Sequence, residues 1–112
     1  MKKNNSIYLE HILNCTEKIL SYTKNMTEGQ FLKNELVQDA VIRNFEIIGE
    51  ATKQLSKEFR NQYEHIPWRD IAGMRDVLIH DYIGVDMWAV WSTVAEYVPK
   101  LKENIETILN KK

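Results

Sequence analysis

The chain has 112 residues and a formal net charge of −1, from 15 Lys and Arg against 16 Asp and Glu. That length fits one domain, so residues 1–112 are expected to share one core. A hydrophobic content of 44% excludes a disordered chain. The balanced charge excludes a nucleic-acid binder that acts through bulk positive charge alone, although it leaves room for a local basic patch.

A single cysteine, Cys15, excludes an internal disulfide and fits a reducing compartment. No apolar run approaches the roughly 20 residues that a membrane helix needs. Glu10 and His11 interrupt the apolar stretch that a signal peptide would require after Lys2 and Lys3. We therefore expect a soluble, cytoplasmic protein without a membrane partner.

Two helices are predicted in the first half of the chain, where apolar residues recur with helical spacing. The first covers about residues 6–22. The second follows a capping-box pattern, S/T-x-x-E/Q, at residues 27–30 and continues to about residue 59. An unbroken helix of about 30 residues would be about 45 Å long. We expect it either to kink, for example near Gly49, or to offer surface to a partner.

Two further helical stretches are predicted in the second half. One covers residues 66–82 and opens at Ile66-Pro67, with proline suited to the first helical position. The other starts at Asp86, a suitable N-cap, and contains Pro99, which should kink it or divide it in two. No segment alternates for long with period two, so strands are not expected. The prediction is an all-α fold, an antiparallel bundle of four or five helices.

Common signatures of catalytic and metal sites are absent from the sequence. The four glycines are scattered, so no phosphate-cradling loop is present. Neither H-E-x-x-H nor C-x-x-C occurs, and the histidines at 11, 65 and 80 are far apart. We therefore predict neither a metal site nor a bound cofactor.

One stretch, residues 74–82, concentrates reactive side chains. Arg75, His80 and Tyr82 form the pattern R-x4-H-x-Y. On a helix, Tyr82 would lie almost directly above Arg75, and His80 about 140° around from it. Asp76 precedes His80 by four residues and can accept its ring N–H. These residues would form a polar cluster at one end of an otherwise packed helix.

Such a cluster contains the groups needed to cut RNA without a metal. Histidine exchanges a proton near neutral pH, and arginine holds a phosphate through two parallel hydrogen bonds. Tyr82 can hydrogen-bond a phosphate or stack on a base. One copy offers few groups, so a dimer that joins two clusters would be the better catalyst. From residue types alone, a surface arginine, a helix-terminal histidine and an interfacial tyrosine remain the favoured interpretation.

The sequence around the motif resembles a known family. Three blocks carry the similarity: AVIRNFEIIGEA at 40–51, IPWRDIAGMRDVLIHDY at 66–82, and a third that runs from GVD at 84–86 to VPKL at 98–101. They resemble the HepT-like toxins of the HEPN superfamily, the ribonuclease half of MNT–HepT toxin–antitoxin pairs. The similarity extends from about residue 39 to residue 108, whereas residues 1–38 match only in helical character.

The resemblance implies a HEPN-like helical bundle that forms a homodimer, with the two motif helices near each other. It implies metal-independent endoribonuclease activity on RNA and a cognate MNT-type nucleotidyltransferase as antitoxin. Arg75 and His80 become the catalytic pair, with Asp76 as a supporting polar residue. Tyr82 becomes the residue that the antitoxin modifies with AMP. An AMP group there would place a bulky anion beside Arg75 and His80 and block the substrate phosphate.

Arg43 and Glu50 are candidates for a supporting role, because they lie seven residues apart on one helix face with Glu46 between them. In a functional interpretation, Arg43 helps to bind RNA and the acids orient the active arginine. The alternative is a ladder of surface ion pairs, worth a few tenths of a kcal/mol per pair. The ladder is the favoured interpretation.

Other residues are expected to be structural. We predict that Trp68, Trp88 and Trp91 are core or interface aromatics, that His65 is an ordinary surface residue, and that residues 100–112 form a solvated helix face. A different class of function also stays open. The chain would then be a non-catalytic helical partner of a nucleotidyltransferase, and the motif a recognition or modification surface.

Overall fold

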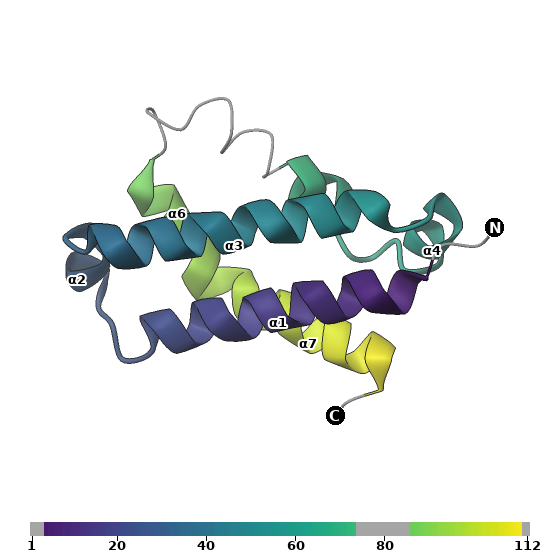
Figure 1. The fold of residues 1–112 in the computed structure, drawn as a ribbon, viewed down its shortest axis with the longest axis horizontal. Coiled ribbons are helices and arrows are strands. Elements are labelled where there is room, and N and C mark those ends of the chain that lie inside the picture. Colours follow the sequence, from purple (N-terminus) through teal and green to yellow (C-terminus); the bar gives the residue numbers. More distant parts are fainter. Residues whose placement is uncertain (1–3, 74–85, 111–112) are drawn as a thin grey trace.

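The computed structural model describes residues 4–73 and 86–110. These residues form helices and no β-strands (Figure 1). The helices are α1 (Asn5–Thr23), α2 (Glu28–Leu32), α3 (Glu35–Gln54), α4 (Lys57–Gln62), α6 (Met87–Glu96) and α7 (Val98–Leu109). Residues 68–73 are also helical. The prediction of an all-α fold is therefore confirmed.

The two long helices α1 and α3 run antiparallel and side by side, and α6 and α7 cross them on one side (Figure 1). The short helices α2 and α4 lie near opposite ends of α3. This arrangement is the predicted helical bundle. Its core is formed by apolar residues from every layer, among them Ile12, Ile19, Phe31, Val41, Phe45, Leu55, Val94 and Ile105.

The expected long helix between residues 27 and 59 does not exist as one helix. It is divided into α2, α3 and α4, while α3 continues through Gly49 without interruption. The divisions fall at polar caps: Asn34 accepts a hydrogen bond from the Val37 N–H at 3.0 Å, and Ser56 accepts one from the Phe59 N–H at 3.2 Å. Because Asn and Ser compete well for helix N-termini, each cap starts a new helix inside a continuous apolar pattern.

Hydrogen bonds between distant segments hold the second division in place. The Asn5 side chain donates to Ser56 Oγ at 3.3 Å and accepts from the Ser56 N–H at 3.1 Å. The start of α1 is thereby joined to the junction of α3 and α4. The predicted capping box at the start of α2 is confirmed, with Thr27 and Gln30 each accepting the other's backbone N–H.

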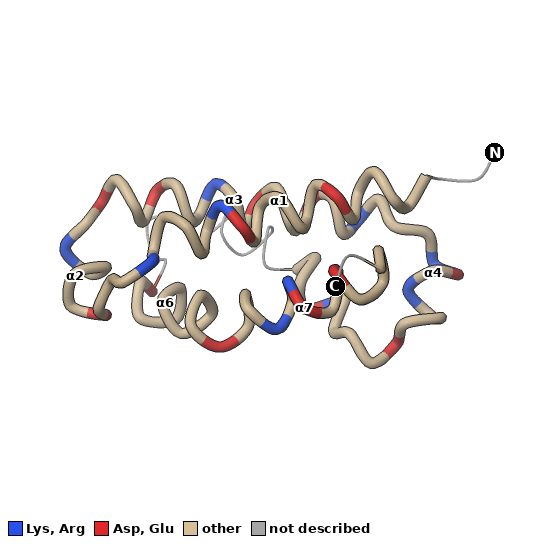
Figure 2. The backbone as a smooth tube through the Cα atoms, turned by 90° about the horizontal axis from the view of Figure 1, so that it is seen from below, with Lys and Arg blue, Asp and Glu red and all other residues tan. Residues whose placement is uncertain are grey.

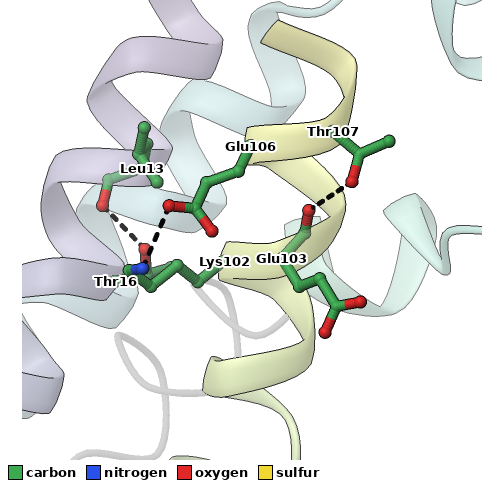
Figure 3. Close-up of polar contacts among 6 residues, drawn as sticks. All are labelled: Leu13, Thr16, Lys102, Glu103, Glu106 and Thr107. Atoms are coloured by element: carbon green, nitrogen blue, oxygen red, sulfur yellow. Dashed lines mark hydrogen bonds and ion pairs between the residues drawn. The ribbon is translucent and has the colours of Figure 1, made fainter. Parts of the chain in front are cut away.

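Pro99 divides the last helical stretch, as expected. Helix α6 ends at Glu96, α7 begins at Val98, and the proline occupies the first turn of α7, where its missing N–H costs nothing. On α7, Lys102 donates to Glu106 at 3.1 Å on the side that lies against α1, near the Thr16 hydroxyl bound to the Leu13 carbonyl (Figure 3).

Charged residues are spread along the described chain. Basic and acidic positions alternate over the helices, and neither sign dominates a long stretch (Figure 2). Among the described residues, no helix is both long enough and apolar enough to span a bilayer.

Candidate functional site

The four motif residues Arg75, Asp76, His80 and Tyr82 lie within 74–85, outside the described residues. The structure instead describes the two points between which this segment runs. The upstream point is the helical segment of residues 68–73, and the downstream point is the start of α6 at residue 86. Both points are held by specific contacts.

The upstream point depends on Trp68, which is 4% exposed. Its indole Nε1–H donates to the Tyr63 carbonyl at 3.0 Å, and its ring lies against that of Phe59, with centroids 5.9 Å apart. Phe59 also packs against the Tyr63 ring at 4.9 Å. The prediction that Trp68 is a core aromatic is confirmed, and it anchors the turn that leads into the motif.

The backbone of this turn determines where the helical segment starts. The Ile66 N–H donates to the Tyr63 carbonyl, and the Ile71 N–H donates to the Pro67 carbonyl, both at 3.1 Å. The sequence predicted that Pro67 would occupy the first helical position. The helix instead begins at residue 68, one residue after the proline. As the residue whose carbonyl accepts the first helical bond, Pro67 occupies the cap position.

The downstream point is the N-cap predicted at Asp86, which is confirmed. Its carboxylate accepts the Trp88 N–H at 2.9 Å, and its carbonyl accepts the Val90 N–H at 3.1 Å. Trp91 packs against Phe31 of α2 with ring centroids 5.1 Å apart, as expected of a core aromatic. Trp88 is 58% exposed, so it lies outside the core, and the other expected position, an interface, stays a prediction.

A cavity of about 520 Å³ lies between the start of the helical segment 68–73, helix α3 and the junction of α6 with α7. We call it the α3–α7 cavity. Its apolar lining consists of Phe45, Ile48, Ile66, Pro67, Ile71, Val98 and Leu101. Its polar lining consists of His65, Asp70, Thr93, Tyr97, Lys100 and Asn104. The cavity therefore combines an apolar floor with charged and hydrogen-bonding groups.

Sequence reasoning did not single out these polar residues. His65 was expected to be an ordinary surface residue, and Lys100 part of a solvated tail. Both are exposed, but both also line the cavity. For Asp70 and Lys100, the only signal in the sequence was that both fall inside the blocks that resemble the family.

Arg43 and Glu50 lie on the exposed side of α3. The Arg43 guanidinium lies 4.0 Å from the Glu46 carboxylate, and 70% of the Arg43 side chain is exposed. This contact is one pair of the kind that the expected ion-pair ladder would contain, and the roles of Arg43 and Glu50 stay predictions. Phe45 and Ile48 of the α3–α7 cavity are about 140–200° around the helix from Arg43, so Arg43 belongs to a different surface.

The charge of Arg43 is also close enough to influence Cys15 of α1. Burial raises the pKa of the Cys15 thiol above its ordinary value of 9.0, although the positive charges of Lys18 and Arg43 partly oppose this effect. Since the thiol is 4% exposed, desolvation of the thiolate dominates. Cys15 is thus a protonated core residue rather than a nucleophile.

The described residues contain no group of three His, Cys, Asp or Glu side chains that could hold a metal ion. Around the α3–α7 cavity, the described part of the chain supplies Lys100 as a cation, Asp70 as an acceptor and Tyr97 as an exposed ring.

Comparison with known proteins matches residues 12–108 to the family model described as "Ribonuclease HepT-like". The chain is 52% identical over 109 residues to the "Gamma-glutamylcyclotransferase and putative RNase" of Methanocaldococcus jannaschii, covering 97% of the chain but only 49% of that relative. It is 44% identical over 108 residues to the "Probable ribonuclease HepT" of Thermococcus cleftensis, covering 96% of the chain and 98% of that relative.

A third relative, the "Putative RNase" of Caldanaerobacter subterraneus, is 43% identical over 104 residues, with 93% of each chain covered. The chain thus spans about half the length of the first of these relatives and nearly the whole of the other two. No solved structure matches it.

Proposed function

Because this chain belongs to the HepT-like ribonuclease family, we propose that it is a metal-independent endoribonuclease and the toxin of a type II toxin–antitoxin pair. One observation carries the proposal: the family match runs from residue 12 to residue 108 and so includes the R-x4-H-x-Y motif of Arg75, His80 and Tyr82. Histidine can transfer protons and arginine can stabilise phosphoryl charge, which are two functions that metal-free cleavage of RNA needs.

In the proposed reaction, the substrate's own 2′-hydroxyl attacks the adjacent phosphorus. A bond forms between the 2′-oxygen and phosphorus, and the bond from phosphorus to the 5′-oxygen breaks. His80 takes the 2′-hydroxyl proton, or returns a proton to the leaving 5′-oxygen, and Arg75 stabilises the charge on the phosphoryl oxygens. The products are a 2′,3′-cyclic phosphate and a free 5′-hydroxyl, so no water enters this step.

The proposed working unit is a homodimer. One histidine cannot serve at the same moment as the base for the 2′-hydroxyl and the acid for the leaving group, whereas two copies supply both. A two-fold axis near the motif would place two Arg75 and two His80 side chains in one groove. It would also create a local positive region in a chain whose net charge is only −1.

The proposed antitoxin is a nucleotidyltransferase that transfers AMP from ATP to Tyr82. The tyrosine oxygen would attack the α-phosphorus of ATP, and pyrophosphate would leave. The added phosphodiester is an anion that would occupy Arg75 and exclude the substrate phosphate. This mode of control needs no change of fold.

The described framework supports the proposal because it holds both ends of the motif segment. Trp68 ties residues 68–73 to the turn at Tyr63, and Asp86 caps α6. Catalytic groups need a rigid support on both sides to keep their geometry.

Incubation of purified protein with RNA in the presence of EDTA tests the proposal. We expect cleavage in EDTA and products that end in a 2′,3′-cyclic phosphate. Cleavage that requires a divalent metal, or products that end in a 5′-phosphate, would contradict the mechanism. A protein that binds a nucleotidyltransferase but leaves RNA intact would instead support the alternative, a non-catalytic helical partner.

A further inference from the structure

We propose that the α3–α7 cavity binds one nucleotide of the RNA and selects bases that carry an exocyclic amino group. This inference rests on the proposed ribonuclease function and adds to it the part of the substrate that determines sequence preference. It is carried by the size of the cavity, by its exposed aromatic ring and by two opposite charges on its lining.

The size and floor of the cavity suit a nucleobase. Its volume of about 520 Å³ falls within the range of about 300–1,000 Å³ typical of small-molecule sites. Phe45, Ile48, Ile71 and Leu101 contribute an apolar lining from three separate segments. A base is flat and apolar on its faces but polar at its edges, which matches an apolar floor bordered by polar groups.

Tyr97 provides a surface for stacking. It lies at the junction of α6 and α7 and is 61% exposed. The next residue, Val98, is 2% exposed and holds the junction in the core. The ring is therefore presented to solvent from a fixed backbone. Proteins that bind single-stranded RNA stack bases on such rings.

Lys100 and Asp70 supply opposite charges at the same cavity. Among the residues that the structure describes, neither side chain forms a hydrogen bond or ion pair. Lysine binds phosphate oxygens, and a carboxylate accepts hydrogen bonds from the amino group of a base. A nucleotide has both features, an anionic phosphate and, in adenine, cytosine and guanine, an exocyclic amino group. An apolar peptide segment in the cavity would provide neither an anion for Lys100 nor a hydrogen-bond donor for Asp70.

The cavity is close to the motif along the chain. Asp70 precedes Arg75 by five residues, a stretch that spans at most about 18 Å even when fully extended. A base in the cavity and a phosphate at Arg75 can therefore belong to one short strand of RNA. Occupation of the cavity would position the strand relative to the phosphate to be cut.

The test measures binding without cleavage. Isotope-labelled His80→Ala protein is titrated with AMP, CMP, GMP and UMP, and methyl signals of Ile66, Ile71 and Leu101 are followed by NMR. We expect saturable shifts with the first three nucleotides and binding of UMP at least about fivefold weaker, because uracil lacks an amino group. Shifts that are absent, or equal for all four nucleotides, would overturn the proposed selectivity.

Variants assign the contacts. Tyr97→Leu should weaken binding about five- to a hundredfold by removing the stacked ring. Lys100→Gln should weaken the binding of nucleotides but not that of the matching nucleosides, which lack the phosphate. Asp70→Asn should abolish the discrimination against UMP. Trp88→Leu, at an exposed aromatic on the same helix α6, and Lys57→Gln, at an exposed lysine, are matched controls that lie outside the cavity. They should bind like the His80→Ala parent.

Failure of this proposal differs from failure of the nuclease assignment. Unsubstituted protein that cuts RNA in EDTA, combined with a cavity that ignores every nucleotide, would overturn the subsite and leave the ribonuclease standing. Nucleotide binding by protein that cuts no RNA would instead support the subsite and overturn the ribonuclease assignment. Cavity signals that respond to a nucleotidyltransferase but not to nucleotides would reveal a protein-docking surface and overturn the proposal. Unchanged backbone spectra establish that each variant is folded.

Discussion

The indole N–H of Trp68 lies 3.0 Å from the carbonyl oxygen of Tyr63, and this hydrogen bond joins the α4 end of the chain to the helical segment that enters the motif. The bond is short in sequence, five residues, but it is made by a ring that is almost fully buried. The hydrogen bond therefore orients the turn between Tyr63 and Trp68, while the Trp68 ring packs against the core. The first testable prediction follows from it.

Trp68→Phe should destabilise the protein by about 1–2 kcal/mol, because it removes one partly buried hydrogen bond and some packed volume. Trp68→Ala should cost about 3–5 kcal/mol. Urea denaturation of both variants measures the free energy of unfolding. Trp88→Phe is the matched control, and its effect should stay within about 0.5 kcal/mol because the side chain is 58% exposed. A Trp68→Phe midpoint equal to that of the parent would disprove an anchoring role.

Arg43→Gln should change stability by less than about 0.5 kcal/mol, since the ion pair with Glu46 is solvent-exposed. If the contact is only part of a surface ladder, cleavage of RNA should keep the parent's rate. A tenfold or larger rise in KM with unchanged stability would instead show that Arg43 binds RNA. Lys57→Gln, which removes another exposed cation, provides the reference for both the stability and the cleavage of RNA.

His80→Ala should abolish cleavage while the circular dichroism spectrum and the unfolding midpoint remain close to those of the parent. General acid–base catalysis by a positioned side chain contributes about 10²–10⁴-fold in rate, so the loss should be at least of that order. Arg75→Ala should likewise abolish toxicity upon expression. His11→Ala, at an exposed histidine of α1 outside the α3–α7 cavity, is the matched control and should cleave RNA like the parent. Cleavage by His80→Ala at the parent rate would refute the assignment.

Intact mass after incubation with the cognate nucleotidyltransferase and ATP tests the modification of Tyr82. We expect the mass of one or more AMP units on the parent and none on Tyr82→Phe. Tyr97→Phe serves as control, because Tyr97 is an exposed tyrosine outside the motif. An adduct that persists on Tyr82→Phe would place the modification elsewhere.

Stability should also depend on pH through Cys15. Burial raises its pKa in the folded state, so above pH 9.0 the folded chain holds a proton that the unfolded chain releases. The contribution is fully present below pH 9.0 and is lost as pH rises toward the folded-state pKa. Against Cys15→Ala, the parent's extra stability should therefore be constant below pH 9.0 and shrink above it. A difference that is flat or grows with pH would contradict this account.

Local patterns explain which features were predictable. The caps at Thr27 and Asp86 bind backbone N–H groups two or three residues away, so a few letters of sequence are enough to place them. The division at Pro99 has the same character, because a proline fits the first turn of a helix but not its interior, where its N–H would be needed. The motif of Arg75, His80 and Tyr82 was likewise recognised from its spacing and the surrounding blocks, but it lies outside the described residues and its role stays a prediction.

The breaks at Asn34 and Ser56 were missed, because the apolar period continues across both caps. At Ser56 the tertiary structure favours the break: Asn5, 51 residues away, binds its backbone N–H and its hydroxyl. A continuous helix at that point would lose both contacts. Such a partner is invisible to any local pattern.

By itself, the sequence determined the helical class, the caps at Thr27 and Asp86 and the family, since each depends on residues that are neighbours along the chain. The roles of Arg75, His80 and Tyr82 stay predictions. The tertiary structure alone decided that Phe45, Asp70, Tyr97 and Lys100 surround one cavity. These residues lie up to 55 positions apart in the sequence (100 − 45). They come from α3, from the helical segment 68–73 and from the region where α6 meets α7. Folding brings these segments together, because burial of apolar faces determines which helices meet.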